Sequence, residues 1–143
     1  MSDELPSLLF VCIENSCRSQ MAEGFARALG GHRVEVYSAG SRPSGQVNAR
    51  AIRFMAEKAV DLASQHSKGL AELPPLHWNY LVTMGCGDEC PFLPARHRLD
   101  WDLPDPKNLG DDAFRSVRDR IETLVIDLIV EATSSRPSTK APR

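Results

Sequence analysis

The sequence has no long apolar run and no excess of positive charge. The apolar stretch at 124–130 is interrupted by Asp127, so it falls short of the roughly 20 residues that a membrane-spanning helix needs. The 17 basic and 19 acidic side chains give a net charge of −2, which offers no electrostatic reason to expect nucleic acid or a membrane surface as a partner. Residues 1–6 also lack the basic start and apolar core of a signal peptide. We therefore expect a cytoplasmic protein.

The length and composition favour one globular domain. The chain has 143 residues, of which 42% are hydrophobic and 25% charged, enough to bury a single core. We expect this domain to cover residues 7–132, and the polar, proline-containing residues 133–143 to form a disordered tail. Four cysteines in a reducing compartment indicate catalysis or metal binding more than structural disulfides.

Strand-like and helix-like patterns alternate along the chain. Short β-prone runs predict strands at 7–12, 34–40, 78–84 and 97–101. Apolar residues at helical spacing predict helices at 19–29, 48–59 and 111–131, and 67–73 has room for one short helix. This alternation predicts an α/β fold, a single-domain parallel sheet with helices on both faces. Ligands of such sheets bind beyond the carboxyl ends of the strands.

Residues 11–19 read V-C-I-E-N-S-C-R-S and connect the first strand to the first helix. Backbone N–H groups and the helix dipole at such a junction favour an oxyanion. Arg18 adds a planar two-pronged donor, and the same field stabilises Cys12 as a nucleophilic thiolate. We predict an oxyanion-binding loop of Cys12, Ile13, Glu14, Asn15, Ser16, Cys17, Arg18 and Ser19.

Two further segments carry candidate chemistry. The loop after the third strand holds Cys86 and Cys90, and 100–106 holds three aspartates beside prolines. One alternative is a zinc site, because the spacings loosely fit four ligands, Cys12, Cys17, Cys86 and Cys90. Zinc gives no reason for the cationic Arg18 beside four thiolates, so we predict no metal.

The cysteine-x5-arginine-serine loop resembles that of the low-molecular-weight protein tyrosine phosphatases. Residues 15–24, N-S-C-R-S-Q-M-A-E-G, are more similar to the thiol-linked, thioredoxin-coupled arsenate reductases built on that phosphatase fold. The resemblance extends from Leu8 to about Ala132. It implies four parallel strands in the order 2-1-3-4.

The resemblance also implies a role for each candidate residue. Cys12 would attack arsenate held by Arg18, and Asp105 would protonate the departing oxygen. Cys86 would then attack the adduct and Cys90 would resolve the resulting disulfide. A thioredoxin-like protein would restore the dithiol, phosphate or sulfate would compete with arsenate, and a monomer without any cofactor would suffice.

Two other functions remain open at this stage. A tyrosine phosphatase would use the same Cys12, Arg18 and Asp105 but release its intermediate to water. A non-enzymatic thiol sensor would instead bind arsenite or zinc and signal to a partner.

Some relatives bind potassium near this loop, through positions that match Asn15, Glu23 and a serine, together with an aspartate. Ser38 fits the serine, but the segment where the aspartate is expected reads His66-Ser67-Lys68. A lysine ammonium could replace the cation here.

Overall fold

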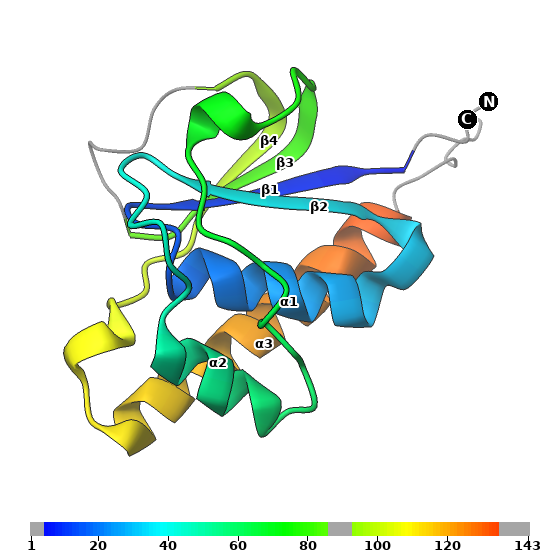
Figure 1. Ribbon diagram of the computed structural model, residues 1–143. Helices are drawn as coiled ribbons and strands as arrows, with labels where there is room; N and C mark the ends of the chain where they lie inside the picture. The colour runs from blue at the N-terminus through cyan, green and yellow to red at the C-terminus, as the bar shows by residue number, and fades with distance from the viewer. Residues whose placement is uncertain (1–4, 86–92, 135–143) are drawn as a thin grey trace.

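The protein contains one four-stranded parallel sheet (Figure 1). The computed structural model describes residues 5–85 and 93–134. The strand order is β2-β1-β3-β4, which confirms the predicted order 2-1-3-4. The strands are β1 (Ser7–Cys12), β2 (Glu35–Gly40), β3 (Trp78–Thr83) and β4 (Ala95–Asp100).

The register of the sheet aligns the carboxyl ends of its strands. Cys12 at the end of β1 pairs with Gly40 at the end of β2. Val11 pairs with Thr83 of β3, which in turn pairs with Asp100 of β4. The loops that follow the strands therefore begin at one rim of the sheet, where ligands of parallel sheets bind.

Three α-helices cover one face of the sheet: α1 (Arg18–Gly30), α2 (Ala49–Ala56) and α3 (Asp111–Ser134) (Figure 1). α1 buries Met21, Ala22 and Phe25 at helical spacing against the sheet and α3. It ends at Gly30 and is capped by Gly31, whose φ of 55° glycine adopts more readily than other residues. The main core lies between these helices and inward side chains of the strands, among them Leu8, Phe10, Tyr80 and Val82.

The opposite face carries a smaller apolar cluster of Leu9, Val11, Trp78 and Leu81. Among the described residues, the one helical segment packed there is the 3-10 helix η2 (Leu70–Glu72), which lies across the sheet from the three α-helices in Figure 1. The expectation of helices on both faces is thus met on this side by a single turn within the predicted 67–73 segment.

Several element boundaries differ from the predicted ones. α2 starts after Asn48, whose side chain accepts hydrogen bonds from two backbone N–H groups of the first turn, and it ends at Ala56 rather than at 59. Ala59 has a φ of 60°, which a helix cannot contain. α3 continues to Ser134, so residues 133–134, predicted to begin the disordered tail, are helical, and the rest of that tail lies outside the described residues.

No helix within the described ranges is long and apolar enough to cross a membrane.

Candidate active site

The loop between β1 and α1 is held in place by hydrogen bonds to its backbone carbonyl groups. Four of its carbonyl oxygens accept hydrogen bonds from backbone N–H groups of the segment after β2. The donor and acceptor pairs are Ser41 to Cys12 (3.3 Å), Arg42 to Ile13 (2.8 Å), Ser44 to Glu14 (3.1 Å) and Asn48 to Ser16 (3.0 Å). The described peptide bonds are all trans, and a trans peptide points its N–H away from its C=O. The N–H groups that follow these carbonyls therefore point to the opposite, concave side of the loop.

Close backbone approach at Gly40 makes this arrangement possible. A Cβ on Gly40 would lie 2.5 Å from the carbonyl oxygen of Ile13 and 2.9 Å from the backbone nitrogen of Asn15. Asn15 itself adopts a φ of 52°, in the left-handed region that asparagine tolerates better than most residues. The tight path of the loop thus depends on a glycine from β2 and on a buried asparagine.

The N-terminus of α1 opens onto the same concave side. No described side chain caps this end of the helix, and its first turn contains no acidic residue. Free N–H groups and the positive end of the helix dipole therefore face the loop. An oxyanion is the natural partner of such an end.

The Cys12 sulfur lies at the bottom of this loop, and the residue is 3% exposed. The sulfur lies 2.8 Å from the Ser19 hydroxyl oxygen. The Asn15 side-chain amide donates to the Ser19 hydroxyl at 2.7 Å and to the Ser38 hydroxyl at 3.0 Å. Because Ser19 accepts from Asn15, its own hydrogen is free to be donated to the Cys12 sulfur.

The hydrogen bonds that the Asn15 side-chain oxygen accepts fix the orientation of its amide group. That oxygen accepts from the backbone N–H of Lys68 at 2.9 Å, and a backbone N–H can only donate. Gln20 donates to the same oxygen at 2.9 Å. The amide nitrogen must therefore face Ser19 and Ser38.

Arg18 brings a buried guanidinium to the loop. It is 6% exposed, and its Nη1 donates to the carbonyl oxygen of Leu103 at 3.0 Å. Its Nη2 lies 3.7 Å from the Asp105 carboxylate. The two loops that follow β1 and β4 are joined through this one side chain.

Asp105 is the aspartate of segment 100–106 that reaches the loop. Its Oδ1 accepts from the backbone N–H of Lys107 at 3.1 Å, which caps the 3-10 helix η4 (Pro106–Asn108), while its Oδ2 faces Arg18. The side chain is 41% exposed, so water can exchange protons with it. Asp100 is engaged elsewhere, because it accepts from the Thr83 hydroxyl at 2.8 Å.

Cys17 is also buried beside the cavity but has a different character. Burial raises the pKa of its thiol from 9.0 to about 12, and the negative charge of Asp105 adds to the effect. Cys17 therefore stays protonated at neutral pH. Cys12 and Cys17 are both free thiols.

A cavity of about 190 Å³ occupies the concave side of the loop. Its lining residues are Cys12, Ile13, Glu14, Ser16, Cys17, Arg18, Arg42 and Asp105. The structure thus brings Cys12, Arg18 and Asp105 to one cavity, whereas Asn15 and Ser19 support it from beneath. Cys86 and Cys90 lie outside the described residues.

The sequence model of the low molecular weight phosphotyrosine protein phosphatases matches residues 7–137. The chain belongs to this family.

Arsenate reductases are among the family members similar to this chain. Arsenate reductase 2 of Staphylococcus epidermidis is 38% identical over 123 residues, which cover 83% of this chain and 92% of that protein. The glutaredoxin arsenate reductase of Synechocystis is 35% identical over 130 residues, covering 89% and 98%.

Solved structures of arsenate reductases are also similar to this chain. An arsenate reductase in the phosphate binding state superposes with a TM-score of 0.81 at 34% identity, covering 90% of this chain and 99% of the other. A thioredoxin-dependent arsenate reductase of Corynebacterium glutamicum superposes with a TM-score of 0.77 at 30% identity, covering 95% and 66%.

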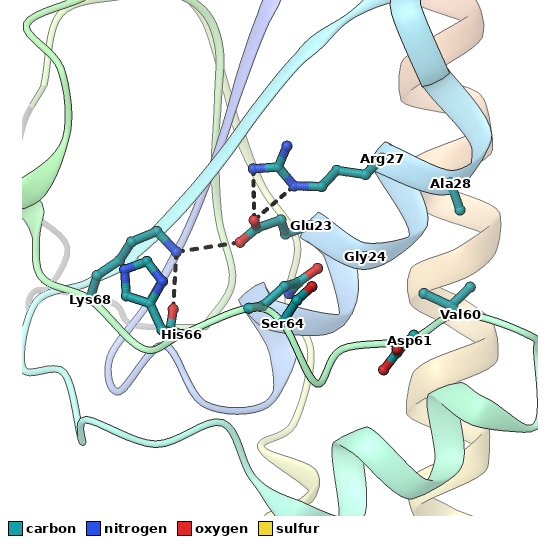
Figure 2. Close-up of a pocket in the computed structure, with 10 residues that line it drawn as sticks. Glu23, Gly24, Arg27, Ala28, Val60, Asp61, Ser64, His66 and Lys68 are labelled. Atoms are coloured by element: carbon teal, nitrogen blue, oxygen red, sulfur yellow. Dashed lines mark hydrogen bonds and ion pairs between the residues drawn. The ribbon is translucent and has the colours of Figure 1, made fainter.

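This family member has a second cavity of about 560 Å³ behind the loop, between α1 and segment 60–68 (Figure 2). Glu23 lies at its inner end with a side chain only 4% exposed. Arg27 pairs with this carboxylate at 2.8 Å and Lys68 at 3.5 Å, and Ser38 donates a short hydrogen bond to it. The chain of contacts from Glu23 through Ser38 and Asn15 therefore ends at Ser19 and Cys12.

Lys68 occupies the position at which the resemblance suggested a cation. Its ammonium nitrogen lies 3.3 Å from the Ser38 hydroxyl and 3.1 Å from the carbonyl oxygen of His66, in addition to Glu23 (Figure 2). The ammonium group thus contacts three oxygen-bearing groups that could otherwise contribute ligands to a cation. In the described part of the chain, no group of three or more His, Cys, Asp or Glu residues could hold a metal ion.

Sequence reasoning missed three residues around the site. Arg42 lines the cavity, Lys107 pairs with Glu14 at 2.9 Å across its mouth, and Gly85 lies against Arg18. Arg42 lies in an irregular loop and Lys107 in the single 3-10 turn η4, and neither segment carries a periodic signal. Gly85 had a signal in principle, because a glycine directly after a buried strand often marks close approach.

Proposed function

We propose that the protein reduces arsenate to arsenite by a cysteine relay, with a thioredoxin-like protein as the electron donor. Arsenate and phosphate are tetrahedral oxyanions of similar size, so phosphate or sulfate is expected to compete for the same cavity. The proposal places the protein in the cytoplasm as a monomer, where its thiols stay reduced.

The observation that carries this proposal is the geometry of the loop around Cys12. Its carbonyls accept hydrogen bonds from the 41–48 segment, so we expect the N–H groups that follow them to face the cavity that Cys12 and Arg18 line. Relatives at 35–38% identity that bear the name arsenate reductase support assigning arsenate as the substrate.

In the first step, the Cys12 thiolate attacks arsenic and a sulfur–arsenic bond forms. One arsenic–oxygen bond breaks, and Asp105 gives its proton to the departing oxygen, which leaves as water. Arg18 and the loop N–H groups bind the remaining oxygens and stabilise their negative charge. Ser19 donates to the sulfur before the attack, which favours the thiolate.

In the second step, the Cys86 thiolate attacks the Cys12 sulfur. The electron pair of the sulfur–arsenic bond moves to arsenic, which is reduced from arsenic(V) to arsenic(III) and leaves as arsenite. Cys90 then attacks Cys86, so that the disulfide moves to Cys86–Cys90 and Cys12 is released as a thiolate. A dithiol donor reduces that disulfide and is itself oxidised.

Substitution of the cysteines tests the proposal with two substrates, arsenate and an aryl phosphate. Cys12→Ser is expected to abolish activity on both, because a serine hydroxyl is a poor nucleophile at neutral pH. Cys86→Ser should abolish arsenate reduction, yet leave unchanged any phosphatase activity that the wild type shows. The measurement is arsenite release and aryl alcohol release for each variant.

Cys17→Ser serves as the matched control, because Cys17 lines the same cavity but stays protonated. It should retain most of the arsenate reductase activity. If Cys86→Ser instead reduced arsenate through many turnovers at the wild-type rate, the relay would be wrong. The tyrosine phosphatase alternative would then be favoured.

A further inference from the structure

Gly85, the second residue after β3, lies directly against the guanidinium of Arg18. A Cβ placed on Gly85 would overlap the Arg18 Nη1 atom and would lie 2.9 Å from the carbonyl oxygen of Leu103. Gly85 also has a φ of +84°, in a region that side chains rarely adopt. Neither its conformation nor its surroundings leave room for another residue.

The Arg18 guanidinium is enclosed by these two neighbours. Nη1 donates to the Leu103 carbonyl at 3.0 Å, and the Gly85 backbone closes the space beside the same atom. The Leu103 oxygen is backbone, so it cannot move aside as the end of a flexible side chain would. A side chain at position 85 must therefore displace the guanidinium or the backbone that precedes Cys86.

The direction of the guanidinium plane matters for binding. Arginine binds a tetrahedral oxyanion through two parallel N–H donors. If the guanidinium plane rotates, one of these two hydrogen bonds is lost. Because Arg18 lines the cavity above Cys12, a displacement at Gly85 is transmitted to the bound oxyanion although Gly85 does not line that cavity.

We propose that Gly85 is a positioning residue for oxyanion binding: by lacking a side chain, it lets the Arg18 guanidinium lie between the corner after β3 and the Leu103 carbonyl, beside the cavity that Arg18 lines. This inference rests on the proposed function only in that the cavity binds an oxyanion. It adds that the residue immediately before the first proposed relay cysteine also sets the position of the substrate-binding arginine.

The first measurement is the dissociation constant for inorganic phosphate, by calorimetry, in the full chain. Gly85→Ala is expected to weaken phosphate binding by about ten-fold or more, the loss of roughly one charge-assisted hydrogen bond. Gly31→Ala is the matched control, because Gly31 also has a positive φ of 55°, but no described atom lies within 4 Å of the place where its methyl group would be. It should change the phosphate affinity by less than about two-fold.

A second variant tests the inference if Gly85→Ala does not fold. Gly85→Asn retains the overlapping Cβ, while asparagine tolerates a positive φ better than alanine. It should weaken phosphate binding like Gly85→Ala. Wild-type affinity in either variant would overturn the inference, whereas a wild-type protein that binds no phosphate would overturn the oxyanion-binding premise and the inference with it.

The second measurement reports the guanidinium directly. The side-chain ¹H–¹⁵Nε NMR signal of Arg18 should shift in both Gly85 variants. Arg118 is the internal control, because it is equally buried at 6% exposure and donates to the carbonyl oxygen of Phe54, far along the sequence from Gly85. An unchanged Arg18 signal would show that Gly85 does not position the guanidinium, and a shift of Arg18 only together with Arg118 would show a general structural effect; either result would overturn the inference.

Discussion

Single side chains give the two cysteines of the loop between β1 and α1 different surroundings, which supports Cys12 rather than Cys17 as the proposed nucleophile. Cys12 and Cys17 are equally buried at 3% exposure, and Cys12 lies beside the Ser19 hydroxyl, whose hydrogen is free to be donated to it. At Cys17, burial and the charge of Asp105 outweigh a hydrogen bond from Ser16 and raise the pKa to about 12, so that thiol keeps its proton. The two cysteines are therefore equally exposed but have different neighbouring groups.

Lys68 is predicted to stabilise the loop through the buried Glu23 carboxylate. Lys68→Ala removes one of the cations that pair with that carboxylate and should lower the free energy of unfolding by about 1–3 kcal/mol. It should also slow alkylation of Cys12 by iodoacetamide, because Ser38, Asn15 and Ser19 connect Glu23 to the sulfur. Urea unfolding and the alkylation rate measure the two effects.

Potassium provides a direct check on this interpretation. If Lys68 replaces a bound cation, potassium but not a bulky organic cation should partly restore the stability of Lys68→Ala. Lys58→Ala is the control, since Lys58 pairs with Glu122 on the surface and its loss should cost less than about 1 kcal/mol. A Lys68→Ala protein as stable as the wild type in the absence of potassium would contradict the prediction.

At the scale of the elements, α2 is joined to α3 by a charged cluster. Glu57, the residue after α2, accepts two hydrogen bonds of 3.0 Å from Arg115 and one of 2.6 Å from Arg118, both on α3. Arg118 also donates to the carbonyl oxygen of Phe54 in the last turn of α2. The helix that supports the 41–48 segment is thereby fixed to the longest helix of the domain.

The cluster predicts how stability depends on pH. The hydrogen bonds from Arg115, and then those from Arg118, lower the pKa of Glu57 from 4.5 to about 2. Since the folded-state pKa is depressed, the contribution of Glu57 is present above about pH 4.5 and is lost as the pH falls toward 2. Glu57→Gln should therefore be less stable than the wild type at pH 6, and the difference should shrink on acidification.

Thermal unfolding of both proteins between pH 6 and acidic pH measures this effect. Glu122→Gln, which breaks the exposed pair with Lys58, is the control and should cost less than about 1 kcal/mol at pH 6. A stability difference between the wild type and Glu57→Gln that stays constant with pH would mean that the carboxylate charge is not what links α2 to α3.

For the molecule as a whole, the sequence predicted the sheet, and the placement of Cys12 and Arg18 at one loop, better than it predicted the contacts that support that loop. The order of the strands follows from alternating patterns together with the family resemblance, and Cys12 and Arg18 are close in the chain. The contact of Gly85 with Arg18 joins residues 67 positions apart, and the carbonyls of the loop are held by the 41–48 segment. Such contacts depend on tertiary packing, which neither periodicity nor local motifs encode.

The burial of Cys12 limits how a donor protein can reach its sulfur. Cys12 is 3% exposed and lines a cavity of about 190 Å³, so we expect the thiol of a donor protein to act elsewhere. Under the proposed relay, the oxidising equivalent has to be carried outward as a disulfide, first to Cys86 and then to Cys90. Removal of Cys90, the last cysteine of the proposed relay, should therefore permit one round of arsenate reduction but prevent further turnover.

Cys90→Ser is expected to release about one arsenite per protein molecule and then to stop as a Cys12–Cys86 disulfide, because a thioredoxin-like donor acts on the Cys86–Cys90 disulfide. Rapid-mix arsenite detection and mass spectrometry of unreduced peptides measure the burst and the trapped pair. Wild-type protein should turn over faster with thioredoxin than with glutaredoxin and glutathione. Sustained turnover of Cys90→Ser with glutaredoxin and glutathione, at the wild-type rate, would instead contradict the Cys86–Cys90 step and identify glutathione as a donor that acts at Cys86.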